Sequence, residues 1–137
     1  MKPVNFILSA LILISIAACK KGELINPTKR PSLVINTSLP GKWKVSGNWL
    51  SSGGPMYFVP ASGSDHVKFN ADGTMDGSAF PQFNNYAFKD TITIRMTSAN
   101  NANYEDYFYK IKGDTLTLGM AGPIICIEGC AVQLVKE

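Results

Sequence analysis

YFYKIKGDTLTL, residues 107–118, is the stretch of the chain that decides the fold. Apolar or aromatic residues occupy alternate positions on both sides of Gly113-Asp114, from Tyr107 to Ile111 and from Leu116 to Leu118. A period of two is typical of strands with one buried and one exposed face. A Gly-Asp pair supplies the backbone freedom that a tight turn needs. The stretch therefore predicts an antiparallel hairpin.

The same alternation recurs from residue 41 onward, and no window keeps a helical spacing. In the first strand, Trp43, Val45, Gly47 and Trp49 are expected to share one face. Further strands are expected around 66–70, 91–96 and 132–134, with turn signals at 70–73, 89–90 and 128–129. Closing such a meander removes its exposed edges. We therefore predict an all-β fold, an antiparallel up-and-down barrel of about eight strands.

Three segments carry a family resemblance. Leu39–Trp43 resembles the L-x-G-x-W opening of lipocalin-like domains, in which the Trp caps the barrel base. Val67–Gly73 and Tyr109–Leu118 are similar to the V-x-F-x-x-D-G and Y-x-I-x-G-D-x-L-x-L segments of small lipocalin-like lipoproteins of Bacteroidota. The resemblance covers most of residues 39–137 and implies a lipocalin-like barrel with a ligand site. Lys136 stands where the family places an arginine over this Trp.

The N-terminal segment predicts export. Lys2 precedes an apolar run, Phe6–Ala18, that is too short for a membrane-spanning helix of about 20 residues. Ile16–Cys19 resembles the lipobox of bacterial lipoproteins, which implies a signal peptide over residues 1–18 and acyl chains on Cys19. Two or three such chains would anchor the protein durably to a membrane. A cleaved signal with a free thiol is the alternative.

Residues 19–38 are predicted to be a lipidated N-terminus and flexible tether, and residues 39–137 the barrel domain. The net charge of +3 comes from the N-terminal part, because from Gly41 onward eight basic residues face nine acidic ones. Nucleic acid is therefore not an expected partner. Lys20–Glu23 loosely resembles the surface-export signals of Bacteroidota lipoproteins, so we expect an outer-membrane location, facing either the periplasm or the cell surface.

Cys126 and Cys130 flank a predicted turn, and in an oxidising compartment a disulfide between them is the favoured interpretation. A zinc site or a redox-active pair is the alternative; His66 alone remains to join the two cysteines at a metal. Asp72–Gly77 lacks the bidentate Glu of a calcium loop. We therefore predict no metal and no cofactor other than the covalent lipid on Cys19.

An enzyme is not expected, because no catalytic constellation can be assembled. Ser64-Asp65-His66 holds the residue types of a hydrolase triad, but neighbours on an extended chain point to opposite faces. A Gly, Ser and Pro-rich loop over 51–64 is expected to frame the barrel mouth. A small apolar or amphipathic ligand, or a glycan, is expected there. A non-enzymatic module that binds a partner protein at the surface is the alternative. The predicted ligand-binding residues are Trp49, Tyr57, Phe58, Phe69, Tyr86, Phe88, Tyr107 and Tyr109.

Overall fold

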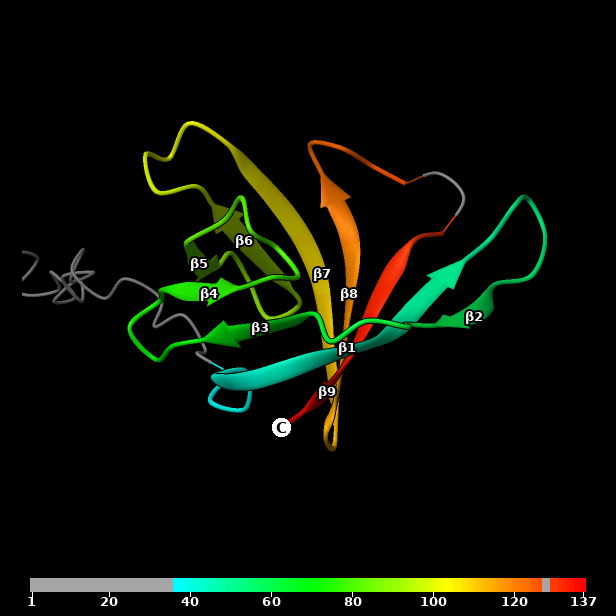
Figure 1. Ribbon diagram of the computed structural model, residues 1–137. Coiled ribbons are helices and arrows are strands. Elements are labelled where there is room, and N and C mark those ends of the chain that lie inside the picture. The colour runs from blue at the N-terminus through cyan, green and yellow to red at the C-terminus, as the bar shows by residue number, and fades with distance from the viewer. Residues whose placement is uncertain (1–35, 127–128) are drawn as a thin grey trace, which may run out of the picture. The chain divides into compact units, whose positions relative to one another are not determined.

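In the computed structural model of the protein, residues 36–126 and 129–137 are described, and every regular element among them is a strand (Figure 1). The predicted signal peptide, Cys19 and most of the predicted tether lie outside these residues. The nine strands are β1 (Gly41–Leu50), β2 (Tyr57–Pro60), β3 (His66–Phe69), β4 (Met75–Gly77), β5 (Asn85–Phe88), β6 (Thr93–Thr97), β7 (Tyr104–Lys112), β8 (Thr115–Gly122) and β9 (Ala131–Lys136).

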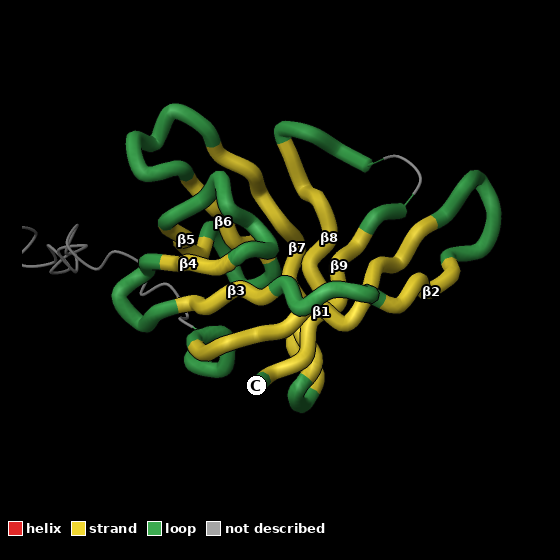
Figure 2. The backbone as a smooth tube through the Cα atoms, viewed as in Figure 1, coloured by secondary structure: helices red, strands yellow, loops and turns green. Residues whose placement is uncertain are grey.

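The strands form one antiparallel sheet in the order β4-β3-β1-β9-β8-β7-β6-β5. β2 and β3 share one position, because β2 pairs with Gly47–Leu50 and β3 with Gly41–Lys44 of the same strand, β1. An isolated bridge between Thr74, just before β4, and Asn85 of β5 joins the two ends of the sheet. The result is a nearly closed up-and-down barrel with eight strand positions (Figure 2). The predicted fold class is confirmed.

The hairpin turns lie where Asp and Gly predict them. Between β3 and β4, the Asp72 carboxylate accepts hydrogen bonds from the backbone N–H (2.9 Å) and the hydroxyl (2.7 Å) of Thr74. Between β7 and β8, Gly113 has a φ of 57°, a left-handed conformation that glycine adopts without strain. Local chemistry thus fixes the turns, and the turns fix the register of the strands beside them.

The barrel has two ends that differ in the turns and loops they hold. The base holds residues 36–40 and the turns at 70–74, 89–92 and 113–114. The open end holds the loops 51–56, 78–84 and 98–103, together with 123–126 and 129–130 of the loop between β8 and β9.

Trp43 closes the base. Its side chain is fully buried, and its indole Nε1 donates a 2.8 Å hydrogen bond to the carbonyl of Leu39. The ammonium of Lys136 lies 5.2 Å from the centroid of the Trp43 ring and donates to the carbonyl of Ser38 at 3.1 Å. Lys136 therefore supplies a cation over the indole.

Aromatic rings fill much of the barrel interior. Phe69 packs against Tyr86 with ring centroids 5.0 Å apart, Tyr86 packs against Phe88 at 6.0 Å, and Phe88 packs against Tyr109 at 5.6 Å. The core is completed by aliphatic side chains from β1, β3, β6, β8 and β9, of which Leu116 is one. We therefore expect ligand space at the ends of the barrel and not in its middle.

β1 does not keep one face along its length, and the expectation that Trp43, Val45, Gly47 and Trp49 share a face is wrong. Between Val45 and Gly47 the pairing of β1 with β9 shifts by one residue, a β-bulge. Trp43 belongs to the core, whereas beyond the bulge Trp49 lies beside Phe58 and Gln133 instead. An extra residue reverses the alternation, because side chains in a strand point to opposite faces in turn.

Candidate functional site

The described residues in the loops of the open end form a rim without charged side chains. Their described residues include Ser, Gly, Asn, Gln, Pro and apolar side chains, but no Lys, Arg, His, Asp or Glu. The long loop expected over 51–64 is interrupted, because residues 57–60 form β2 and pair with the far half of β1. Only its first part, 51–56, belongs to the rim.

One hollow, called the inner hollow below, enters the barrel from the open end. It has a volume of about 280 Å³. Apolar side chains dominate its wall, and the rings of Phe80 and Tyr107 pack edge to face with centroids 5.7 Å apart. Its lining residues are Asn48, Leu50, Ala79, Phe80, Gln82, Tyr107, Leu118, Met120, Cys130, Ala131 and Val132. The bulge in β1 places Asn48 and Leu50 here.

A second hollow, called the rim hollow, lies between the loops 78–84, 98–103 and 123–126. Its volume is about 430 Å³, and Gln82 lines both hollows. Its lining residues are Gln82, Phe83, Ala102, Asn103, Tyr104, Glu105, Pro123 and Ile124. Apolar walls with a few converging polar groups are characteristic of small-molecule sites.

Glu105 is the acidic residue of the rim hollow. It lies on β7 opposite the fully buried Met96 of β6 and is itself only 7 % exposed. Its Oε1 atom is buried and has no hydrogen-bond partner among the described residues. Burial raises the pKa of Tyr107, two residues along the strand, to about 12, and the charge of Glu105 adds to that rise. An unpaired buried carboxylate costs free energy unless something binds it.

The next residue, Asp106, has the opposite environment. Its carboxylate accepts hydrogen bonds from Arg95 Nε at 2.8 Å and Nη2 at 3.1 Å, and from Lys89 Nζ at 2.7 Å. The guanidinium of Arg95, aided by Lys89, lowers the pKa of Asp106 to about 2, although burial opposes the change. Of two adjacent acids, one is therefore neutralised by two cations and the other is left unpaired.

Glu105 is not among the site residues predicted above, although the sequence carries a signal for it. Glu105 lies at an alternate position in line with Tyr107, Tyr109 and Ile111, so it is a charged residue on the face of the strand that is otherwise apolar. A charged side chain on that face points toward the barrel interior. The cue is visible only when the alternation is extended to the residues before Tyr107.

The predicted ligand-binding aromatics are dispersed. Tyr107 is the one that lines the inner hollow, while Phe69 and Tyr109 are core residues. Trp49 and Phe58 contact each other on the β1–β2 hairpin with centroids 5.2 Å apart, and Trp49 Nε1 donates to Gln133 Oε1 at 2.9 Å. On the same hairpin, the side chain of Tyr57 is 51 % exposed. Tyr86 and Phe88 remain, and both line a third hollow at the base.

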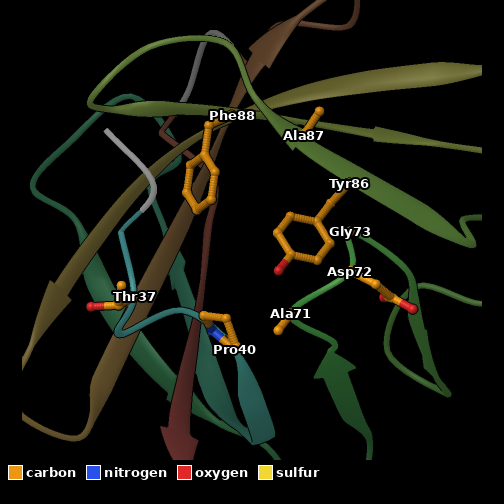
Figure 3. Close-up of a pocket in the computed structure, with 8 residues that line it drawn as sticks. All are labelled: Thr37, Pro40, Ala71, Asp72, Gly73, Tyr86, Ala87 and Phe88. Atoms are coloured by element: carbon orange, nitrogen blue, oxygen red, sulfur yellow. The ribbon is translucent and has the colours of Figure 1, made fainter. Parts of the chain in front are cut away.

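The base hollow lies in the seam where β5 runs past the β3–β4 turn, and its volume is about 460 Å³. Figure 3 shows the rings of Tyr86, Phe88 and Pro40 facing a shared space, with the Asp72 carboxylate directed away from it. Tyr86 donates its hydroxyl proton to the carbonyl of Asn70 at 2.7 Å. The Tyr86 hydroxyl and the Asp72 carboxylate at this hollow are thus hydrogen-bonded within the protein, in contrast to Oε1 of Glu105 at the open end.

The predicted disulfide between Cys126 and Cys130 is confirmed, with Cα atoms 5.7 Å apart. It lies in the rim, since Cys130 lines the inner hollow, and the Met56 side chain at the tip of the β1–β2 hairpin covers Gly129. Within the described residues, no three His, Cys, Asp or Glu side chains gather as metal ligands. No helix in the same part of the chain is suited to crossing a membrane.

No model of a known protein family matches the chain, and no curated protein or solved structure matches it either. The function is therefore inferred from the geometry and chemistry of the open end.

Proposed function

We propose that the protein is a lipid-anchored lipoprotein of the outer membrane whose barrel binds a small amphipathic ligand at the open end. The observation that carries the binding part is the pair of hollows at the open end, about 280 and 430 Å³, lined by apolar and aromatic side chains with few polar groups. Pockets that bind small molecules have this composition and range from about 300 to 1,000 Å³.

The disulfide and the hairpin tip support this proposal. Cys126–Cys130 closes a short loop in the rim, and Met56 lies against Gly129 of that loop. A site whose walls are already held in place loses less entropy when it binds a ligand. The open end is thus better prepared for a ligand than a set of independent loops would be.

The binding proposal is tested by native mass spectrometry of the full chain, released from detergent micelles after expression with its own signal. We expect a retained or saturably added small molecule, and a loss of that species when Leu118→Trp fills the inner hollow. As a control, Phe108→Trp places the same side chain at an exposed position of β7. Absence of any adduct under saturating amphipathic probes would refute ligand binding.

The anchor rests on the sequence of residues 16–19. Metabolic labelling with an alkyne fatty acid is expected to mark the wild-type chain and to leave Cys19→Ser unmarked. Equal labelling of the two chains would contradict acylation at this residue.

A second candidate function is binding of a partner protein, because large apolar side chains gather at the open end. Met56 is 49 % exposed, Tyr57 51 %, Ile124 62 % and Ile125 66 %. Exposed apolar groups at one end of a protein often mark an interaction surface. A membrane protein that copurifies with wild type and is lost with Met56→Ser plus Ile125→Ser would favour this function. The same pair of substitutions would leave a small-molecule adduct in place if the hollows alone bind it.

A further inference from the structure

We propose that Glu105 makes the open end selective for a ligand with a cationic amine, which places its ammonium in the rim hollow and its apolar part in the inner hollow. This inference rests on the ligand-binding function proposed above and names the chemical class of the ligand. It begins from the unpartnered Oε1 of a side chain that is 7 % exposed.

Among the described residues, no cation forms an ion pair with Glu105. The described residues of the open-end loops are all uncharged, and the two cations closest along the sheet, Arg95 and Lys89, are bound to Asp106. The guanidinium of Arg95 also lies 4.0 Å from the centroid of the Tyr104 ring, which fixes its position further. An incoming ammonium would therefore meet a carboxylate that no described cation neutralises.

The wall of the rim hollow suits a cation in a second way. Phe83 lines it together with Glu105, and aromatic faces attract ammonium groups. Gln82 and Asn103 offer side-chain oxygens that can accept the remaining N–H donors. A primary amine has three donors, so Glu105 and these two amides match its hydrogen-bonding capacity.

The inner hollow accounts for the other half of the ligand. Leu50, Leu118, Met120 and Val132 give it an apolar wall, and Gln82 lines both this hollow and the rim hollow. A short alkyl or aryl group would displace water from this apolar wall, which favours binding. The two hollows together thus fit an amphipathic amine better than a neutral lipid or an anion.

The test compares an amine with its neutral isostere. Isothermal titration of the full chain in a non-ionic detergent is run with 2-phenylethylamine and with 2-phenylethanol, and detergent alone is the blank. We expect the amine to bind wild type on the order of 30-fold more tightly than the alcohol, because a buried charge pair is lost with the alcohol.

Two variants make the result specific to Glu105. Glu105→Gln keeps the shape of the side chain and is expected to abolish the preference for the amine while leaving alcohol binding within about twofold. Asp114→Asn removes one acid at the base and is expected to keep the preference. Thermal unfolding of each variant verifies that it is folded, and Glu105→Leu is the second variant if Glu105→Gln is not.

Each outcome decides the inference. Equal binding of amine and alcohol to wild type would overturn the role of Glu105 and leave ligand binding itself intact. An amine preference that survives in Glu105→Gln would also overturn it, since the selectivity would then arise elsewhere. Failure of both probes to bind would overturn the inference as well. If native mass spectrometry still shows a bound small molecule, the proposed ligand-binding function stands even though the inference about Glu105 has failed.

Discussion

Replacing Glu105 by Met is expected to stabilise the unliganded protein. In wild type, Oε1 of Glu105 is buried opposite Met96 and unpaired, and leaving a polar atom in that state costs about 1–3 kcal/mol. A methionine of similar length removes the unpaired atom without opening a cavity. For a domain of about 100 residues, each kcal/mol shifts Tm by about 4–8 °C, so we expect Tm to rise by about 4 °C or more.

The assay is thermal unfolding of the full chain in detergent at neutral pH, followed by intrinsic tryptophan fluorescence. Glu105→Ala is the matched comparison, because it removes the same carboxylate but leaves a void that costs part of the gain. A fall in Tm for Glu105→Met would refute the reasoning, since it would mean that the carboxylate is satisfied in the folded protein. Gain of stability with loss of ligand is the usual signature of a functional buried charge.

Three further predictions concern the framework. The free energy of unfolding should decrease as the pH is lowered from about 4 to about 2. The pKa of Asp106 is lowered from 3.8 to about 2 in the folded state, so protonation of this carboxylate favours unfolding. Urea midpoints measured across this pH range check the prediction. Gly47→Ala should lower the free energy of unfolding in urea by about 1–3 kcal/mol, because the added Cβ would lie 2.5 Å from the Phe58 ring. A urea midpoint equal to that of wild type would contradict this packing. Reduction of Cys126–Cys130 should lower stability by roughly 2 kcal/mol, and the Cys126→Ser, Cys130→Ser double variant should then be insensitive to reductant.

Strand pairing in this protein is largely legible in the sequence. The alternation from Tyr107 to Leu118 and the turn residues at 70–73 predict β7, β8 and the β3–β4 turn correctly, because each depends on neighbours a few positions apart. The disulfide follows from two cysteines at the ends of one short loop. These features are local, and local chemistry is what a single sequence reports best.

The residues that line the hollows are harder to predict, because alternation assigns a side chain to a face without telling whether that face is filled. Phe69 and Tyr109 belong to a packed core, whereas Tyr107 borders open space, yet all three have the same pattern. The bulge between Val45 and Gly47 depends on pairing with β9, far away in the chain, so Trp49 was assigned to the wrong face. Both errors are failures of non-local information.

The bulge in β1 divides the strand into two segments with different roles, one in the packing of the base and one in the wall of the inner hollow. Before it, Trp43 is locked into the base by Leu39 and Lys136, and beyond it, Asn48 and Leu50 border the inner hollow. Because the register is reset between them, the lining can change while the base keeps its packing. We therefore expect substitutions at Asn48 or Leu50 to reshape the inner hollow at little cost to the stability of the base.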